Sequence, residues 1–335
     1  MIRKKRQKRP GWTITAKNNH FLMFKVVFVL TLIAVAANCF AEDPPINIPI
    51  SPNLRLQILL DRAGYSPGEI DGSFGKNTIK ALAAFQKSHQ LKPTARADSA
   101  TLKALNSLSE QPLLKRYTIT EKDTMGPFVR KFPKDLQEWT KLPRTDYTSP
   151  LELLGEVFHV NPIVLRKWNP KAKYKTGETI IVPNVTSLDD LILNPVENGE
   201  VTVYVSKKNS DVLVRNGEGK VILYAPVTQG DNLAPLPLGK YTVTKIEDYP
   251  YFHYNPKLFS RPNKKHKGGL IAPGPNNPVG IVWIDLSLDH YGLHGTPAPE
   301  KIGHTASNGC IRLTNWDAFR LSTMVMPGTP VHFVK

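Results

Sequence analysis

Residues His294 to Leu313 read HGTPAPEKIGHTASNGCIRL, and this stretch decides how the C-terminal part of the chain folds. It starts with a His-Gly pair and ends with a glycine turn, a cysteine and a short apolar strand. Sixteen positions separate His294 from Cys310. A thiol is a good nucleophile only as thiolate, and a free cysteine has a pKa of about 8.5. Because a nearby imidazole can take the thiol proton, the pattern predicts a Cys/His nucleophile pair.

The glycine before the sulfur indicates an oxyanion site. Gly309 permits a sharp turn that can aim the N–H groups of Gly309 and Cys310 at a developing oxyanion. The alternative is a buried structural cysteine, which is common for this residue type. Cys39, the other cysteine, lies in the expected leader, so removal of the leader would leave Cys310 as the lone thiol of an exported protein. A lone thiol in that setting favours the nucleophile.

The stretch resembles the signature of the L,D-transpeptidases, which cross-link bacterial peptidoglycan. Their pattern is HG, a loop, and then [S/T]-x-G-C-[I/V]-R. The matching residues are His294, Gly295, Ser307, Asn308, Gly309, Cys310, Ile311 and Arg312. Many members carry histidine at the position of Asn308. The resemblance covers about residues 200–335.

The resemblance implies an acyl transfer in which His294 accepts the thiol proton and the carbonyl of Gly295 orients its imidazole. The Cys310 thiolate would attack the third residue of a tetrapeptide stem and expel D-alanine, and a neighbouring amine would then form a 3→3 cross-link. The thioester stores the acyl energy, so no cofactor is expected, and carbapenems should acylate the thiol. The alternatives are L,D-carboxypeptidase activity, attachment of an outer-membrane lipoprotein, or a non-catalytic wall-binding protein.

Four further residues near the pair are candidates for shaping the site or binding substrate. Arg312 lies two positions after Cys310 and so shares its face of a strand, where it meets either a substrate carboxylate or a partner in the fold. Ser307 and Asn308 are expected to shape the turn or contact substrate. Tyr291 is a substrate-binding candidate with an architectural role as the alternative.

The histidines of this region also raise the question of a metal site. The candidate ligands are His290, His294, His304 and Cys310. On a strand, positions 290 and 294 lie roughly 13 Å apart, too far for one tetrahedral ion. We therefore expect no metal.

Charge and leader predict an exported protein with an anionic partner. The 335-residue chain has a net charge of +16, and residues 1–41 hold eight Lys/Arg and no acid, which leaves 36 Lys/Arg against 28 Asp/Glu, or +8. The apolar run Val26 to Ala37 has the length of a signal peptide core, with Met1 or Met23 as the start and cleavage after Ala41. An uncleaved inner-membrane anchor is the alternative. The expected location is the periplasm or cell envelope. The carboxylate-rich wall suits the charge, whereas no basic helix or aromatic–basic ladder indicates nucleic acid.

The whole chain is predicted to be a multidomain α+β protein. After the leader comes a proline-rich linker at 42–53, and residues 54–110 predict three short helices around a glycine turn. This module resembles a peptidoglycan-binding domain. The matching residues are Leu56, Gln57, Gly64, Asp71, Gly72, Phe74, Gly75, Thr78, Ala81, Phe85 and Gln86. Helix caps are expected at Ser51 and Asp98.

Residues 117–185 predict the order β-α-α-β. With Trp168-Asn169-Pro170 and a final Ile181-Val182-Pro183, this order resembles a LysM glycan-binding module interrupted by an insertion at about 122–148. Sugar binding and a structural role between the flanking domains are both open.

Residues 186–199 are expected to be a linker, followed by a mostly-β catalytic domain at 200–335. Alternating valines from Val201 and glycine turns predict a sandwich-like or barrel-like sheet domain. One helix is expected from Asn315 to Val325. The charge run Arg261 to Lys267 is either a solvated loop or a lid that attracts the carboxylates of stem peptides.

Overall fold

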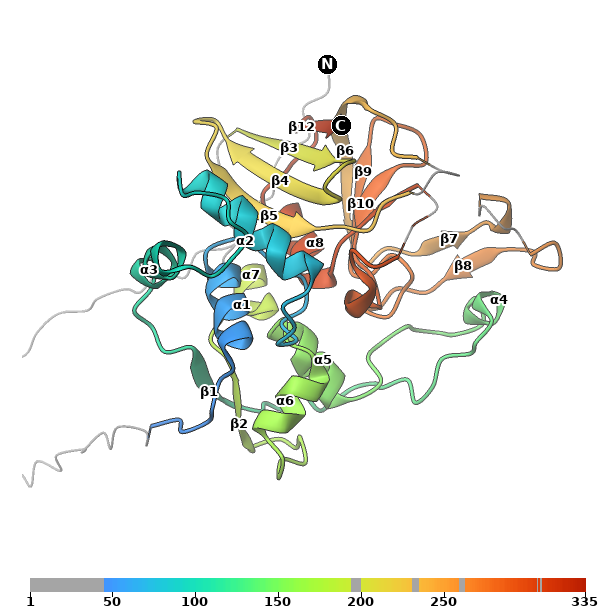
Figure 1. Ribbon diagram of the computed structural model, residues 1–335. Helices are drawn as coiled ribbons and strands as arrows, with labels where there is room; N and C mark the ends of the chain where they lie inside the picture. Colours follow the sequence, from blue (N-terminus) through green and yellow to red (C-terminus); the bar gives the residue numbers. More distant parts are fainter. Residues whose placement is uncertain (1–44, 194–199, 231–234, 259–262, 306, 308) are drawn as a thin grey trace, which may run out of the picture. The chain divides into compact units, whose positions relative to one another are not determined.

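The computed structural model describes residues 45–193, 200–230, 235–258, 263–305, 307 and 309–335 (Figure 1). From Ile46 to Lys335 the chain forms one compact unit. The expected leader and the position of Asn308 lie outside the described residues. Within these ranges, none of the helices combines the length and apolar character that crossing a membrane would need.

The N-terminal module has the three predicted helices. They are α1 (Pro52–Arg62), α2 (Lys76–Ser88) and α3 (Ser99–Ser107). The predicted caps are confirmed: the Ser51 hydroxyl accepts from the backbone N–H of Leu54, and the Asp98 carboxylate accepts from that of Thr101. Each cap satisfies an N–H group that the first helical turn leaves without a partner.

The two motif glutamines of this module are structural. Gln57 is 1% exposed; its amide donates to the Asp71 carboxylate (2.8 Å) and accepts from the Gly72 N–H (2.7 Å), so it fixes the glycine turn. Gln86 is fully buried and donates to the Thr101 hydroxyl at 2.8 Å. Buried amides need such partners. These contacts occupy both glutamines in stabilising the module.

The middle module has the predicted β-α-α-β order. Its elements are β1 (Leu114–Thr118), α5 (Pro150–Val157), α6 (Pro162–Trp168) and β2 (Thr179–Pro183), and the two strands pair antiparallel. Asn169 ends α6 and joins it to β2, because its side chain donates to the Ile181 carbonyl (2.8 Å) and accepts from the Ile181 N–H (2.7 Å). The LysM identity of the module stays a prediction.

The C-terminal domain is built on one sheet of eight strands. These are β3 (Val201–Ser206), β4 (Asp211–Asn216), β5 (Val221–Pro226), β6 (Gly239–Asp248), β9 (Val282–Leu286), β10 (Gly292–His294), β11 (Ile311–Arg312) and β12 (Pro330–Val334), in the order β11-β10-β9-β6-β12-β3-β4-β5. The pairs β10–β11 and β12–β3 are parallel and the others antiparallel. A separate hairpin consists of β7 (Phe252–Tyr254) and β8 (Gly269–Ile271), and two 3-10 turns are η1 (Pro256–Leu258) and η2 (Pro299–Lys301).

The two edges of the large sheet approach each other. Thr228, just after β5, forms a bridge with Arg312 of β11, and Gly230 forms one with Ser307. The sheet is therefore curled, which agrees with the prediction of a mostly-β, sandwich-like or barrel-like domain. Strand β6 joins the two halves of the sheet: its first residues pair with β12, and its later residues pair with β9 across a register shift between Val243 and Lys245.

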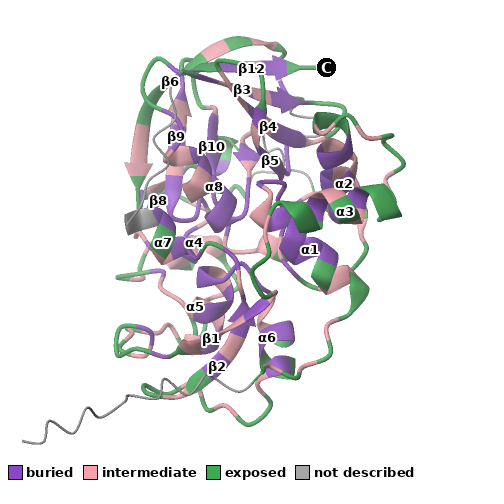
Figure 2. Ribbon diagram, turned by 90° about the vertical axis from the view of Figure 1, so that its left-hand side faces the viewer, coloured by how far each residue is buried: buried purple, intermediate pink, exposed green. Residues whose placement is uncertain are grey.

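Two helices pack against this sheet and differ from expectation. The expected linker at 186–199 begins with α7 (Leu188–Leu193), whose Leu188 and Leu191 are buried in the sheet's core because their spacing of three places both on one face. Helix α8 spans Asn315–Ser322 and ends at Thr323, earlier than the predicted Val325. Figure 2 shows the buried residues of α8 beneath β10 and β9.

Candidate active site

The parallel pairing of β10 with β11 brings the predicted site residues together. Leu293 pairs with Ile311 and His294 pairs with Arg312, while Cys310 directly precedes β11. Paired residues of neighbouring strands, and residues two apart on one strand, point to the same face. His294, Arg312 and Cys310 are therefore held on one face of the sheet.

The imidazole of His294 is buried, neutral and held in one orientation. It is 3% exposed, stacks on Trp283 with ring centres 5.2 Å apart, and donates from Nδ1 to the Gly295 carbonyl at 2.7 Å. Because the carbonyl can only accept, Nδ1 carries the hydrogen and Nε2 is the basic nitrogen. Burial and then the charge of Arg312 lower the pKa of His294 to about 3, against the opposing effect of the Gly295 and Val279 carbonyls, so the ring is neutral near pH 7.

The thiol of Cys310 is protonated in the resting state. Its sulfur donates to the His290 carbonyl at 3.5 Å. Burial raises the pKa of Cys310, while the backbone of Gly292 and the charge of Arg312 act in the opposite direction. Within the described part of the chain no hydrogen bond joins the sulfur to His294. Proton transfer between the two therefore requires the thiol to turn away from His290.

Ser307 shapes the turn before the cysteine. Its hydroxyl accepts from the Gly309 N–H at 3.2 Å and donates to the Cys310 carbonyl at 2.6 Å. Gly309 has φ +125°, a conformation that L side chains rarely adopt, and a Cβ there would lie 3.5 Å from the ring of Tyr291. The Gly309 N–H already donates to the Ser307 hydroxyl. To bind an oxyanion as predicted, this N–H must either donate to both oxygens or leave the Ser307 hydroxyl. Asn308 lies outside the described residues.

Arg312 is the cation of the site. Its Nε is buried without a hydrogen-bond partner, and none of the carboxylates that the structure describes forms an ion pair with it. Burial lowers the pKa of its guanidinium, and the charge of Cys310 acts against this. Of the two predicted roles, this arrangement favours an interaction with an anion on the cysteine face over an ion pair within the fold.

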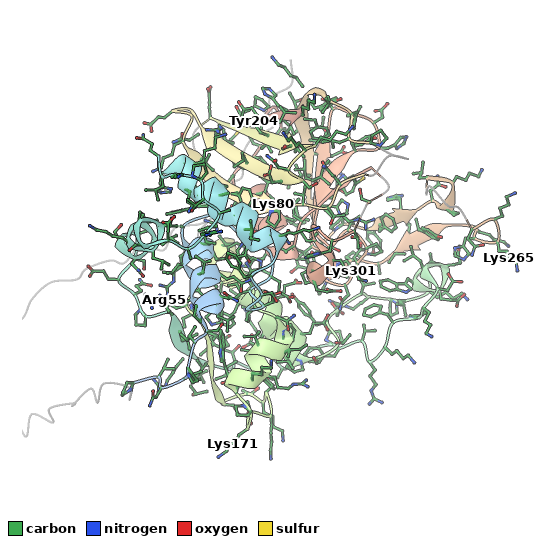
Figure 3. All side chains as sticks on the ribbon, viewed as in Figure 1. Arg55, Lys80, Lys171, Tyr204, Lys265 and Lys301 are labelled. Atoms are coloured by element: carbon green, nitrogen blue, oxygen red, sulfur yellow. The ribbon has the colours of Figure 1, made fainter. Side chains whose placement is uncertain are left out.

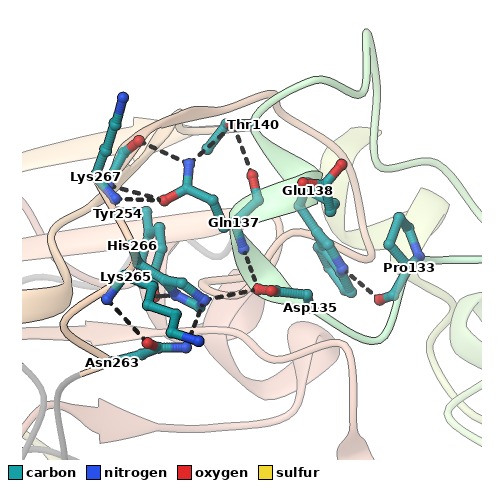
Figure 4. Close-up of polar contacts among 12 residues, drawn as sticks. Pro133, Asp135, Gln137, Glu138, Thr140, Tyr254, Asn263, Lys265, His266 and Lys267 are labelled. Carbon is teal, nitrogen blue, oxygen red and sulfur yellow. Dashed lines mark hydrogen bonds and ion pairs between the residues drawn. The ribbon is translucent and has the colours of Figure 1, made fainter.

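The charged loop before the site lies on the β7–β8 hairpin, which contacts the insertion of the middle module (Figure 4). Gln137 lies in helix α4 (Leu136–Trp139) of this insertion. Its side-chain amide donates to the Gly268 carbonyl (3.0 Å) and accepts from the N–H groups of Lys267 and Gly268 (2.9 Å each). Lys264 and Lys265 are exposed, and Figure 3 shows Lys265 at the tip of the hairpin. Arg261 lies outside the described residues.

Two functional candidates escaped sequence reasoning, Asn315 and Glu156. The side chain of Asn315 contacts the backbone directly after His294, and Glu156 of α5 contacts Asn315. The only sequence signal for Asn315 is its place as the first residue of the predicted helix, which the structure shows to be capped by Thr314. Glu156 lies on an ordinary amphipathic helix and carries no signal. In the described ranges, no group of three or more His, Cys, Asp or Glu side chains is arranged to hold a metal ion.

Comparison with known proteins identifies the family of the catalytic domain. The family model of the L,D-transpeptidase catalytic domain matches residues 200–333, and that of a peptidoglycan-binding domain matches residues 54–105. YqjB of Bacillus subtilis, named as an L,D-transpeptidase, is 31% identical over 144 residues, which cover 41% of this chain and 73% of that protein. YkuD of Bacillus licheniformis, named likewise, is 26% identical over 184 residues, or 54% of this chain and 91% of that protein.

A solved L,D-transpeptidase from Mycobacterium smegmatis is 20% identical with a TM-score of 0.34, and the match covers 41% of this chain and 59% of that one. The family match includes every described residue of the Cys310 site, and the relatives carry the same enzyme name. The chain therefore belongs to the L,D-transpeptidase family of enzymes and carries a peptidoglycan-binding domain ahead of its catalytic domain.

Proposed function

We propose that the protein is a peptidoglycan L,D-transpeptidase that works through a thioester on Cys310. The thiol proton passes to Nε2 of His294 as the sulfur attacks the carbonyl carbon of the third stem residue. Collapse of the tetrahedral intermediate breaks the peptide bond to D-alanine, whose amine takes the proton back from His294. An amine of a neighbouring stem then attacks the thioester, which forms the 3→3 cross-link and frees the thiol.

One observation supports this proposal most strongly: His294, Arg312 and Cys310 share one face, with His294 held by the Gly295 carbonyl. A neutral imidazole with one unprotonated nitrogen is the form that a general base requires. The positive charge of Arg312 favours the thiolate over the thiol. The charge of Arg312 acts against the burial that keeps the sulfur protonated, but it does not outweigh it.

Other partners of the proposed enzyme follow from its modules. The peptidoglycan-binding domain is proposed to hold the enzyme at glycan strands, and the middle module either adds a LysM-type contact or joins its neighbours. Export to the periplasm or cell envelope fits these partners. A solved LD transpeptidase is in complex with imipenem, and we expect carbapenems to acylate Cys310 here because the β-lactam carbonyl meets the same thiolate.

The alternative activities differ in the group that accepts the acyl chain from the Cys310 thioester. Incubation of the full chain with purified disaccharide-tetrapeptide, followed by mass spectrometry, is expected to give a dimer lacking one D-alanine. A tripeptide product would indicate L,D-carboxypeptidase activity, and transfer only to an added lipoprotein peptide would indicate wall attachment of lipoproteins. An unchanged substrate would leave a wall-binding protein without catalysis.

A further inference from the structure

The peptide unit between Gly295 and Thr296 is held at both ends. Its carbonyl accepts from Nδ1 of His294 at 2.7 Å, and its N–H donates to Oδ1 of Asn315 at 3.1 Å. A peptide unit is planar and rigid. Whatever fixes the direction of the N–H therefore also fixes the direction of the carbonyl, and with it the plane of the imidazole.

The amide of Asn315 can adopt only one orientation. Its nitrogen donates to the Pro275 carbonyl (3.0 Å) and to both oxygens of Glu156 (3.0 and 2.9 Å). The Pro275 carbonyl and the ionised Glu156 carboxylate can only accept, so the amide oxygen must face the N–H groups of Ile281 (3.2 Å) and Thr296. A flipped amide would lose all of these bonds.

The glycine of the His-Gly pair is required by this contact. A Cβ at Gly295 would lie 2.1 Å from Oδ1 of Asn315, and one at Gly280 would lie 1.9 Å from the same atom. Real Cβ contacts are never so short, so Asn315 reaches the 295–296 peptide only because both positions lack side chains. The glycine of the His-Gly pair therefore also makes room for the side chain of Asn315.

Glu156 brings the middle module into this arrangement. It lies on α5, its carboxylate accepts from the Tyr147 hydroxyl at 2.7 Å, and it lines a cavity of about 320 Å³ together with Asn315. Burial raises the pKa of Glu156 to about 7, against the lowering effect of the Tyr147 and Asn315 hydrogen bonds. Burying a carboxylate lowers the stability of the fold, so its presence here points to a role beyond packing.

We propose that Asn315 is a positioning residue for His294, and that Glu156 holds Asn315 so that the middle module sets the orientation of the catalytic base. The inference rests on the proposed role of His294. It assigns the β-α-α-β module a part in the chemistry, separate from any contact with glycan. Neither Asn315 nor Glu156 touches the reacting atoms in this account; both act through the 295–296 peptide.

The test uses an exchange of the amide and the acid. Asn315→Asp keeps the acceptor for Thr296 but places a carboxylate against Glu156, so we expect kcat on disaccharide-tetrapeptide to fall roughly 10- to 100-fold with KM little changed. The double variant Glu156→Gln/Asn315→Asp restores a donor facing an acceptor and should recover part of that loss. A merely structural role predicts no such rescue of kcat at equal melting temperature.

A second readout does not depend on turnover. The rate of Cys310 alkylation by iodoacetamide, measured from pH 5 to 10 on the full chain, reports the thiolate that His294 supports. The single variant should shift this profile and the double variant should move it back. If the wild type alkylates but does not turn over substrate, the proposed function fails while the profile still decides the inference.

Gln86→Glu is the matched control, because it is the same amide-to-acid change in a buried hydrogen-bonded side chain of the N-terminal module. It should lower the melting temperature and leave kcat and the alkylation profile unchanged. The inference is overturned if Asn315→Asp and Glu156→Gln both keep kcat and the profile within about twofold, or if Gln86→Glu reduces kcat as much. Should Asn315→Asp fail to fold, Glu156→Gln alone decides by its profile.

Discussion

At the scale of single residues, the site pairs a neutral imidazole with a neutral thiol, and the cation Arg312 shifts the pKa values of both. Burial lowers the pKa of His294 to about 3 and raises that of Cys310, so neither group is charged at rest. Arg312 lies close enough to affect both pKa values, in the direction that disfavours imidazolium and favours thiolate. The sulfur's reactivity should therefore depend on this guanidinium.

Arg312→Met removes that charge while keeping a long side chain. We expect the pKa of Cys310 to rise and alkylation at pH 7 to slow by about tenfold, since one pKa unit is a tenfold change in thiolate. The rate of iodoacetamide labelling at pH 7 measures this change in the reactivity of Cys310. Arg320→Met, a change on α8 where Arg320 covers the Trp316 ring, is the control; equal labelling of the Arg312 variant and the wild type would refute the role.

At the scale of elements, the β7–β8 hairpin carries the charge run that the sequence predicts to be either a solvated loop or a lid. Its backbone at Lys267 and Gly268 is held by Gln137 of the insertion, so the insertion supports the hairpin while the lysines at its tip are exposed (Figure 4). Exposed charges attract a distant anion only when salt does not screen them. If the hairpin acts as a lid, its effect is therefore expected on substrate affinity at low ionic strength.

Neutralising the hairpin tests this role. Replacement of Lys264, Lys265 and Lys267 by glutamine should raise KM for a stem peptide at low salt, and the effect should vanish near 0.5 M salt, where screening is nearly complete. The matched control replaces Lys171, Lys173 and Lys175, exposed lysines of the middle module. An unchanged KM in the hairpin variant at low salt would make the run an ordinary solvated loop.

Local patterns predicted most elements, whereas contacts distant in sequence could not be predicted. The caps Ser51 and Asp98, the alternating valines of β3 and the order of the middle module all follow from neighbours within a few residues. The spacing of His294 and Cys310 predicted the pair because two short strands lie side by side. Nothing local connects Glu156 with Asn315, 159 positions later. The helix α7 was missed because its six residues are too few for a clear period.

At the scale of the whole compact unit, one buried cluster joins all three modules. His159 of the middle module bonds to Asp61 of α1 at 2.7 Å and stacks on Trp316 of α8, and Asp317 of α8 accepts from Ser66 at 2.9 Å. Burial alone would lower the pKa of His159; the hydrogen bond and charge of Asp61, with the charges of Asp317 and Glu69, outweigh it and raise the pKa.

The stability of this unit should therefore fall in mild alkali. A histidine whose folded pKa exceeds its unfolded value of 6.5 stabilises the fold fully below pH 6.5 and loses that contribution as pH rises through the folded pKa. The buried carboxyl of Glu156, with a pKa raised to about 7, adds a loss in the same direction, beginning above its unfolded value of 4.5. The groups facing the imidazole are Asp61, Asp317, Glu69 and Glu156.

Chemical denaturation from pH 5.5 to 9 measures this dependence, and His159→Gln should flatten it relative to the wild type. Between pH 5.5 and 6.5 His294 acts in the opposite direction, because its lowered pKa makes a falling pH favour the unfolded chain, so the contribution of His159 is taken from the slope above pH 6.5. A His159→Gln variant with the full wild-type slope would show that the cluster does not link the modules through a proton.

The central claim is that sulfur and imidazole together build a thioester on one residue. Intact-mass spectrometry of the full chain, quenched in acid seconds after mixing with a tetrapeptide that lacks an acceptor amine, tests it most directly. The account predicts a mass gain equal to the tripeptide acyl group, located on Cys310 by peptide mapping and missing from Cys310→Ala. No adduct on the wild type, with carbapenem labelling also absent, or an adduct that persists in Cys310→Ala, would contradict it.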